Sequence, residues 1–168
     1  MRVRPEQPGD APQIRTIHQQ AFDSDTEAKL IEELRRTDLA LISLVAEELQ
    51  QLIGHILFSP VTLSGRTNAP AIAGLGPIAV LPQWQQRGVG SLLITTGLEY
   101  CARAGYGAVV VVGHPAYYPR FGFVPASHFN IKSEFNVPDE VFMVKELQAA
   151  ALKNVTGTIQ YHPAFSQA

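Results

Sequence analysis

The sequence predicts a mixed α/β domain whose central sheet starts antiparallel and then turns partly parallel. Two stretches rich in β-forming residues, 41–47 and 52–63, are separated by a short polar segment, which is typical of an antiparallel hairpin. A strand over 72–81, a helix over 88–103 and an uninterrupted apolar run over 108–112 follow in that order. This order predicts a right-handed crossover between two parallel strands, the second of them buried on both faces.

The elements before the hairpin are a short strand and two amphipathic helices. The strand is expected at 3–4, and a helix over 10–22 follows, capped by the Asp10 side chain. Ser24 and Glu27 match a capping box for a second helix. The apolar residues of these helices recur at helical spacing, so each helix is expected to bury one face.

Turn and end signals separate the remaining elements. The polar segments 48–51 and 64–68 are predicted turns, Pro82 ends the strand before it, and Gly105 and Gly107 are expected to end the long helix. Three further segments complete the prediction: a short helix or turn at 116–121, a strand at 142–147, and an added edge strand within 155–165.

Composition limits the class of protein. A length of 168 residues predicts one domain, 1–168, and 46% hydrophobic residues are enough for a sizeable core. Charged residues make up 17%, below the average of about 25%, so neither disorder nor a coiled coil describes the whole chain. Because 13 Lys and Arg face 15 Asp and Glu, for a net charge of −2, nucleic acid is not an expected partner.

Cysteine and hydropathy patterns favour a cytoplasmic protein. The single cysteine, Cys101, can form no intramolecular disulfide and no cysteine-built zinc site, and the five histidines are not closely paired, so no metal is expected. No apolar run approaches the roughly 18 residues of a membrane span, and no signal peptide is recognisable, so no membrane association is expected.

The most informative stretch joins the strand at 72–81 to the long helix. Gln85-Gln86-Arg87-Gly88-Val89-Gly90-Ser91 forms a glycine-containing turn that opens the helix. The first N–H groups of a helix are unpaired and lie at the positive end of its dipole, so this turn predicts an anion site, most naturally for a diphosphate. The alternative is that Gly88 and Gly90 only make a tight turn; the glycine patterns of the P-loop and of the dinucleotide fold are absent.

These residues resemble a known family. Gln85-x-x-Gly88-x-Gly90, after the strand ending Ile78-Ala79-Val80-Leu81-Pro82, is similar to the acetyl-CoA signature of the GNAT N-acetyltransferase superfamily. Tyr117-Tyr118-Pro119-Arg120-Phe121-Gly122-Phe123 is similar to a second element of that fold, about 30 residues later. The resemblance spans roughly 1–147 and is strongest to small bacterial YhbS-like members. It implies a mostly antiparallel sheet with a parallel strand–helix–strand unit and helices on both faces.

The resemblance implies that acetyl-CoA is the cosubstrate and that an amine attacks its thioester directly, without a covalent enzyme intermediate. Tyr118 matches the family's general acid for the leaving sulfur. A strand N–H, plausibly that of Val80, would bind the thioester oxygen. The residues that would hold CoA are Ile78, Ala79 and Val80, along the pantetheine arm, and Gln85, Gln86, Arg87, Gly88, Val89, Gly90 and Ser91, around the pyrophosphate.

The general base is not assigned by the sequence. Some family members carry a glutamate where this chain has Gly74, and many carry an asparagine where it has Gly113-His114-Pro115. His114 is the first candidate catalytic residue in its place; His55, Glu47, Glu48 and a water relay are alternatives. His18 shares the apolar face of its helix and is expected to be structural.

Two functions remain open on the sequence alone. The first is an N-acetyltransferase acting on a small-molecule, peptide or protein amine, whose positive charge Glu47, Glu48, Asp23 and Asp25 would attract. The alternative for these four acids is that they only cap helices and form a solvated turn. The second is a non-catalytic acyl-CoA-binding or sensing module that has lost its base. Trp84 is expected either to cover apolar surface or to contact a second copy in a homodimer.

Overall fold

The computed structural model describes residues 1–64 and 69–167, so positions 65–68 of the predicted turn at 64–68 lie outside the described residues. Contacts group the chain into two compact units. The first comprises Met1–Ser59, Gly76–Gly97 and Pro163–Ala168, and the second Pro60–Leu75 and Leu98–His162. The expectation of one domain over 1–168 stays a prediction.

The described residues form the mixed, mostly antiparallel sheet that the sequence predicts. Its strand order is β1-β2-β3-β4-β5-β8-β6, and β9 pairs with β3 and β7. β4 and β5 pair in parallel, and α3 lies between them in the sequence. This confirms the predicted strand–helix–strand unit. The strands are β1 (Arg2–Pro5), β2 (Ile42–Glu48), β3 (Gln51–Leu63), β4 (Ile72–Val80), β5 (Ala108–Val112), β6 (Val124–Pro125), β7 (Ile131–Ser133), β8 (Phe142–Glu146) and β9 (Gly157–Gln160).

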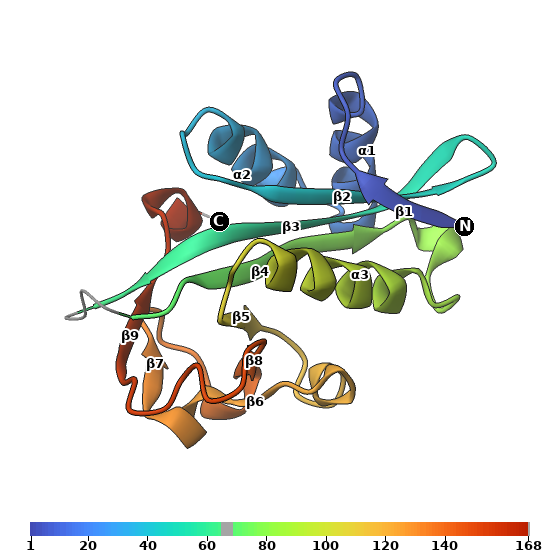
Figure 1. The fold of residues 1–168 in the computed structure, drawn as a ribbon. Helices are drawn as coiled ribbons and strands as arrows, with labels where there is room; N and C mark the ends of the chain where they lie inside the picture. The colour runs from blue at the N-terminus through green and yellow to red at the C-terminus, as the bar shows by residue number, and fades with distance from the viewer. Residues whose placement is uncertain (65–68, 168) are drawn as a thin grey trace. The chain divides into compact units, whose positions relative to one another are not determined.

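Helices cover both faces of β3 within the first unit (Figure 1). On one face lie α1 (Ala11–Phe22) and α2 (Thr26–Arg35), and Leu57 of β3 packs with the buried leucines of α2. On the other face lies α3 (Val89–Arg103), where Gly54 of β3 leaves room for the Leu93 side chain. The alternation of side chains along β3 thus serves both layers.

The helix caps differ from the prediction. Asp10 precedes α1, but its side chain makes no cap: it accepts hydrogen bonds from Arg4 Nη1 at 2.9 Å and from the Gln7 N–H at 2.7 Å. Arg4, on β1, binds the Asp10 carboxylate in place of the backbone N–H groups of α1, because a hydrogen bond between two charged groups is stronger than one to a neutral amide. The predicted capping box is also wrong, since Asp25 is the N-cap of α2, and Ser24 Oγ accepts the Thr26 N–H instead.

The hairpin is confirmed, whereas the C-terminal strand differs from its prediction. Leu49 and Gln50 join β2 to β3 with φ of 50° and 66°, the left-handed conformation of a two-residue hairpin turn. Instead of an added edge within 155–165, β9 lies between β3 and the unpredicted β7. The 3-10 helices are η1 (Pro82–Trp84), η2 (Tyr118–Phe121), η3 (Ala126–Phe129), η4 (Asp139–Val141) and η5 (Pro163–Gln167).

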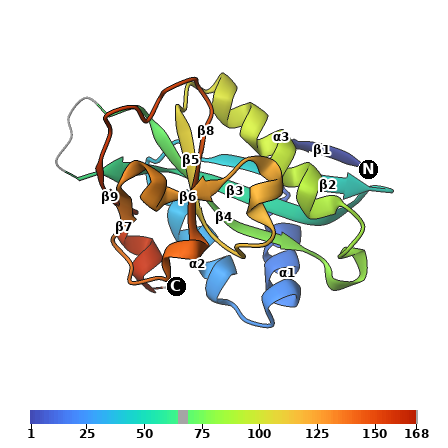
Figure 2. The same cartoon turned by 90° about the horizontal axis from the view of Figure 1, so that it is seen from below.

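Strands β5 and β8 form the centre of the second unit (Figure 2). Ala108 to Val111 of β5 are at most 1% exposed, as expected for a strand buried on both faces, but the last residue, Val112, is 44% exposed. Val112 lies opposite Phe142, the first residue of β8. The carboxyl end of β5 is therefore the point where the buried strand reaches the surface.

Candidate functional site

The turn before α3 is exposed and held by its own backbone. After β4, η1 leads into Gln85, whose side-chain Nε2 donates to the Val80 carbonyl at 3.1 Å. Gln86 and Gly88 have φ of 62° and 85°. Space around Gly88 is open: a Cβ there would meet no atom within 4 Å. The positive φ therefore favours glycine at position 88, and the open space beside Gly88 leaves room for a ligand.

This turn presents the start of α3 to solvent. The first helical hydrogen bond runs from the Leu92 N–H to the Gly88 carbonyl at 3.1 Å, so the Val89 and Gly90 amides have no acceptor within their own helix. The Arg87 guanidinium lies 5.3 Å from the centroid of the Trp84 ring, which holds a cation beside these amides. Unpaired donors, the helix dipole and a fixed cation together make an anion-binding surface.

Beside the turn, one backbone edge of β4 has no partner strand over part of its length among the strands that the structure describes. The register of β4 with β5 covers Ile72, Ala73 and Gly74 only, so the stretch with Ile78, Ala79 and Val80 has no β5 partner among the residues described. Ala79 is buried, whereas Ile78 and Val80 are half-buried. Such an edge can bind an extended molecule through its backbone groups.

Tyr118 occupies a shaped slot in the second unit. Its side chain is 7% exposed, and its ring lies so close to Gly113 that a Cβ there would come within 2.2 Å of it. Tyr117 and Phe123 contact the ring edge-on, at centroid distances of 5.3 and 5.7 Å. Burial, followed by the neighbouring Tyr117, raises the pKa of Tyr118 to about 12, so the phenol keeps its proton at neutral pH.

His114, the other predicted catalytic residue, lies exposed just beyond β5. Its Nδ1 accepts the Ala116 N–H at 3.2 Å, so the hydrogen of the neutral ring is on Nε2. Nδ1, the ring nitrogen that could act as a base, is therefore already the acceptor of a backbone hydrogen bond. Gly74 offers no base either, and the space beside it is filled by the Tyr161 ring and Val61.

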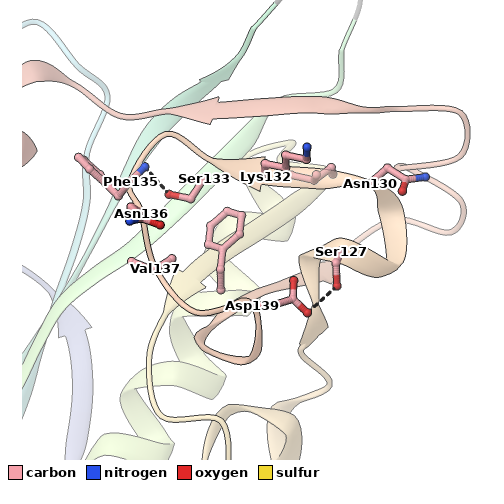
Figure 3. Close-up of a pocket in the computed structure, with 10 residues that line it drawn as sticks. Ser127, Asn130, Lys132, Ser133, Phe135, Asn136, Val137 and Asp139 are labelled. Atoms are coloured by element: carbon pink, nitrogen blue, oxygen red, sulfur yellow. Dashed lines mark hydrogen bonds between the residues drawn. The ribbon is translucent and has the colours of Figure 1, made fainter.

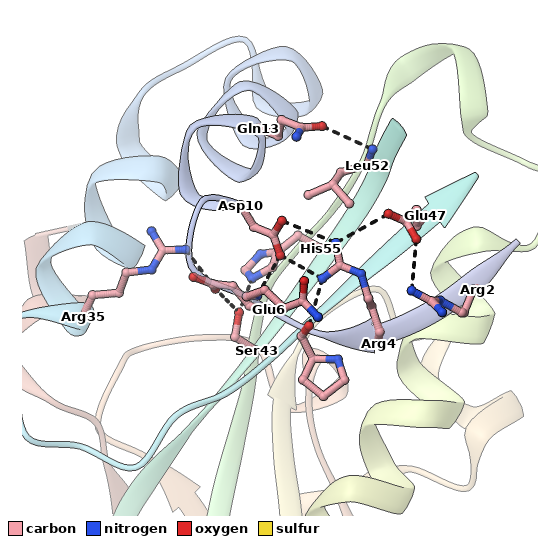
Figure 4. A network of polar contacts seen from close by, with 12 residues as sticks. Arg2, Arg4, Glu6, Asp10, Gln13, Arg35, Ser43, Glu47, Leu52 and His55 are labelled. Atoms are coloured by element: carbon pink, nitrogen blue, oxygen red, sulfur yellow. Dashed lines mark hydrogen bonds and ion pairs between the residues drawn. The ribbon is translucent and has the colours of Figure 1, made fainter. Parts of the chain in front are cut away.

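His55 and His18 are buried in a hydrogen-bonded chain in the first unit. His18 Nε2 and His55 Nδ1 are 2.8 Å apart, and His55 Nε2 is 2.8 Å from Ser43 Oγ. Ser43 donates to Glu6, which also binds Arg35 at 2.9 Å (Figure 4). Because the Glu6 carboxylate only accepts, each donor of this hydrogen-bond network points toward Glu6. His55 therefore accepts at Nδ1 and donates from Nε2, which makes its ring neutral.

The electrostatics of this histidine pair agree with a structural role. Both side chains are 0% exposed; burial lowers the pKa of His18 to about 4, with Arg35 as a lesser cause. Burial, then His18 and Arg35, lowers the pKa of His55 well below its usual value. Glu47 pairs with Arg2 and Arg4, and Glu48 with the N-terminal amine. Three of the alternative bases are thus engaged in structural contacts.

The family model for the acetyltransferase (GNAT) domain matches residues 2–126, about three quarters of the chain. The chain belongs to the GNAT acetyltransferase family. The chain is 37% identical over 168 residues to the uncharacterised N-acetyltransferase YhbS of Escherichia coli K12, covering 99% of both. Its fold matches the crystal structure of E. coli YhbS in complex with CoA with a TM-score of 0.92, over 98% of this chain and 91% of that one.

A second solved structure agrees with this assignment. It is a GNAT family acetyltransferase from Brucella melitensis in complex with acetyl-CoA, 34% identical, with a TM-score of 0.80. The match covers 98% of this acetyltransferase and 97% of the Brucella chain. The family resemblance predicted from the two motifs is therefore confirmed.

Other chemistry-bearing groups of this GNAT acetyltransferase are inert or dispersed. Cys101 is 0% exposed, and burial raises the pKa of its thiol to about 12, so it is no nucleophile. Over residues 1–64 and 69–167, no cluster of three His, Cys, Asp or Glu side chains could hold a metal ion. In the same residues no helix is both long and apolar enough to cross a membrane.

Proposed function

We propose that this acetyltransferase moves the acetyl group of acetyl-CoA directly to a primary amine, both substrates being bound together. The observation that carries the proposal is the turn at 85–91, where the Val89 and Gly90 amides have no acceptor within their own helix, Gly88 has a positive φ, and Arg87 stacks on Trp84. The amides from Gly88 to Ser91 would bind the pyrophosphate, and Gln85, Gln86 and Arg87 would line it. The E. coli and Brucella relatives were crystallised with CoA and acetyl-CoA, which supports acetyl-CoA as the cosubstrate.

The pantetheine arm would lie along the open edge of β4. Ile78, Ala79 and Val80 would exchange backbone hydrogen bonds with its amides, as an added strand does. The Val80 N–H would then be one donor for the oxygen of the thioester, whose negative charge grows as the amine attacks.

Direct transfer needs a neutral amine and a proton for the leaving sulfur. The amine nitrogen forms the new bond to the acetyl carbon, the carbon–sulfur bond breaks, and Tyr118 donates its proton to the sulfur. The raised pKa of Tyr118 keeps this proton available throughout the neutral range. His114 is the second candidate catalytic residue, although its Nδ1 already accepts the Ala116 N–H. Water can accept the amine's proton in its place.

The proposal treats the whole chain, 1–168, as one acyltransferase domain that acts in the cytoplasm on a small-molecule or peptide amine. If Trp84 contacts a second copy, the protein is a homodimer. One observation favours a second candidate, a non-catalytic acyl-CoA-binding or sensing module. Gly74 carries no side chain, and Tyr161 and Val61 fill the space beside it, so β4 provides no carboxylate base there.

Calorimetric titration with acetyl-CoA tests the cofactor site. Gly88→Glu places a carboxylate among the phosphate-binding amides, and we expect affinity to fall more than tenfold. The matched control is Gly105→Glu, because Gly105 has a φ of 95° and open space like Gly88, but follows the other end of α3. Equal affinity in folded Gly88→Glu protein would refute the site, and binding without turnover of any amine in a broad panel would favour the sensing module.

A further inference from the structure

A cavity of about 360 Å³ lies in the second unit and has no assigned role (Figure 3). Its volume falls in the lower range of small-ligand sites, roughly 300–1,000 Å³. Ile131 and Phe142 form an apolar floor and are 1% and 5% exposed. Half-buried Phe135 and Val137 extend this apolar lining. The interior therefore suits one apolar side chain.

The rim of the cavity is polar and only partly engaged. Asp139 accepts a hydrogen bond from Ser127 Oγ at 3.0 Å. Asn130, Asn136 and Lys132 also line the rim, and their side chains make no hydrogen bond or ion pair with other described residues. In Figure 3 Lys132 and Asp139 lie on opposite sides of the cavity.

The cavity adjoins the strand end near Tyr118. Phe142, on its floor, lies opposite Val112, the exposed last residue of β5. The Gly113 N–H donates to the carbonyl of Val141, the residue before Phe142, at 2.9 Å. Successive residues of an extended chain face opposite sides, so Val112 faces the cavity side and Gly113 faces the Tyr118 ring. Tyr118, the proposed proton donor, and the cavity therefore lie on the two sides of this strand end.

The charges and hydrogen-bonding groups of the lining residues limit the chemical class of ligand that the cavity can bind. The charged residues that line the cavity are Asp139 and Lys132, on opposite sides, so the Asp139 side can attract the ammonium of a ligand. The carboxamides of Asn130 and Asn136 each offer a donor and an acceptor, and an amide group has the same two functions.

We propose that this cavity binds the residue that carries the acceptor amine, and that this residue is an apolar amino acid followed by an amide, as in an amino-acid amide or a peptide amino terminus. Its side chain lies on Ile131 and Phe142, its amide bonds Asn136, and Asp139 attracts its ammonium. This inference rests on the proposed function, since it names the acceptor class of that same reaction.

The first test compares three amines in an acetyl-CoA consumption assay: phenylalaninamide, glycinamide and phenylalanine. Burial of one large apolar side chain contributes about 1.5–3 kcal/mol, so kcat/KM for phenylalaninamide should exceed that for glycinamide at least tenfold. Asp139→Asn should raise KM for phenylalaninamide about fivefold, the upper range for an exposed ion pair. Val137→Trp, which fills the cavity, should remove the preference over glycinamide. The matched control is Glu140→Gln, at the exposed neighbour that does not line the cavity.

The second test needs no turnover. Phenylalaninamide added to the wild-type chain should shift the NMR signals of the Asn136 side-chain amide and the Val137 methyl groups. In Val137→Trp the Asn136 side-chain amide signal should not shift. Failure to bind acetyl-CoA, or to acetylate any amine, would overturn the proposed function. Acetylation of other amines at rates that Asp139→Asn and Val137→Trp leave unchanged, without these NMR shifts, would overturn the acceptor inference alone.

Discussion

The neutral histidine pair should make the fold sensitive to mild acid. The pKa of His18 is about 4 in the folded chain, against about 6.5 in the unfolded chain. Between these values the unfolded chain binds a proton that the folded chain refuses, so stability falls as pH drops below about 6.5 and the loss is complete below about 4. From pH 7.5 to 4.5, His18 alone should remove roughly 2–3 kcal/mol of stability, and His55 should add to this loss.

The perturbation that isolates this effect is His18→Gln. A glutamine can still donate a hydrogen bond from its Nε2 toward His55 Nδ1, but it does not titrate. The free energy of unfolding, measured by urea denaturation at several pH values, should fall less steeply in His18→Gln than in wild type, by roughly 2 kcal/mol over this range. His128→Gln removes an exposed histidine as a control. Parallel curves for His18→Gln and wild type would show that His18 is not held neutral by burial.

Three further predictions concern catalysis. Tyr118→Phe should keep its packing and its acetyl-CoA affinity but lower kcat about 10²-fold, and an unchanged kcat would make Tyr118 purely structural. Gly113→Ala should force the Tyr118 ring to move, because its Cβ would lie 2.2 Å from that ring, so both kcat and the thermal midpoint should fall; retention of both would contradict the slot. Amine acetylation should become faster from about pH 6 to 9 as the amine or a base loses its proton, and a pH-independent rate, or reaction of alcohols alone, would exclude an amine nucleophile.

Local patterns predicted the elements that depend on neighbours in sequence. The β-forming residues of 41–47 and 52–63, the proline and glycines around α3 and the apolar run of β5 each give a strong signal, and the structure confirms those elements. Asp10 shows where this reasoning ends: its sequence position suits a helix cap, but Arg4, delivered by the pairing of β1 with β2, takes its carboxylate. Only tertiary structure reveals that competition.

The candidate site was predictable to a similar extent. The turn at 85–91 has a local signature, and its backbone conformation agrees with that signature. The slot for Tyr118 depends on Gly113, five residues earlier, and no periodic pattern reveals that contact. The cavity at 127–142 was not predicted, because β7 is only three residues long and its partner β9 begins 24 residues after it ends. Asn130 and Asn136 line the cavity, but no rule of sequence spacing connects two asparagines to a ligand.

The stacking of Arg87 on Trp84 gives the molecule an optical probe of its own. Trp84 is the only tryptophan in the sequence, so selectively excited indole fluorescence arises from this one ring. The ring lies beside the amides at the start of α3, and a cation rests over it. An anion that draws the guanidinium away from the ring changes the field on the indole, and hence its emission. The turn can therefore be observed in real time, in unlabelled protein, against a background without other indoles.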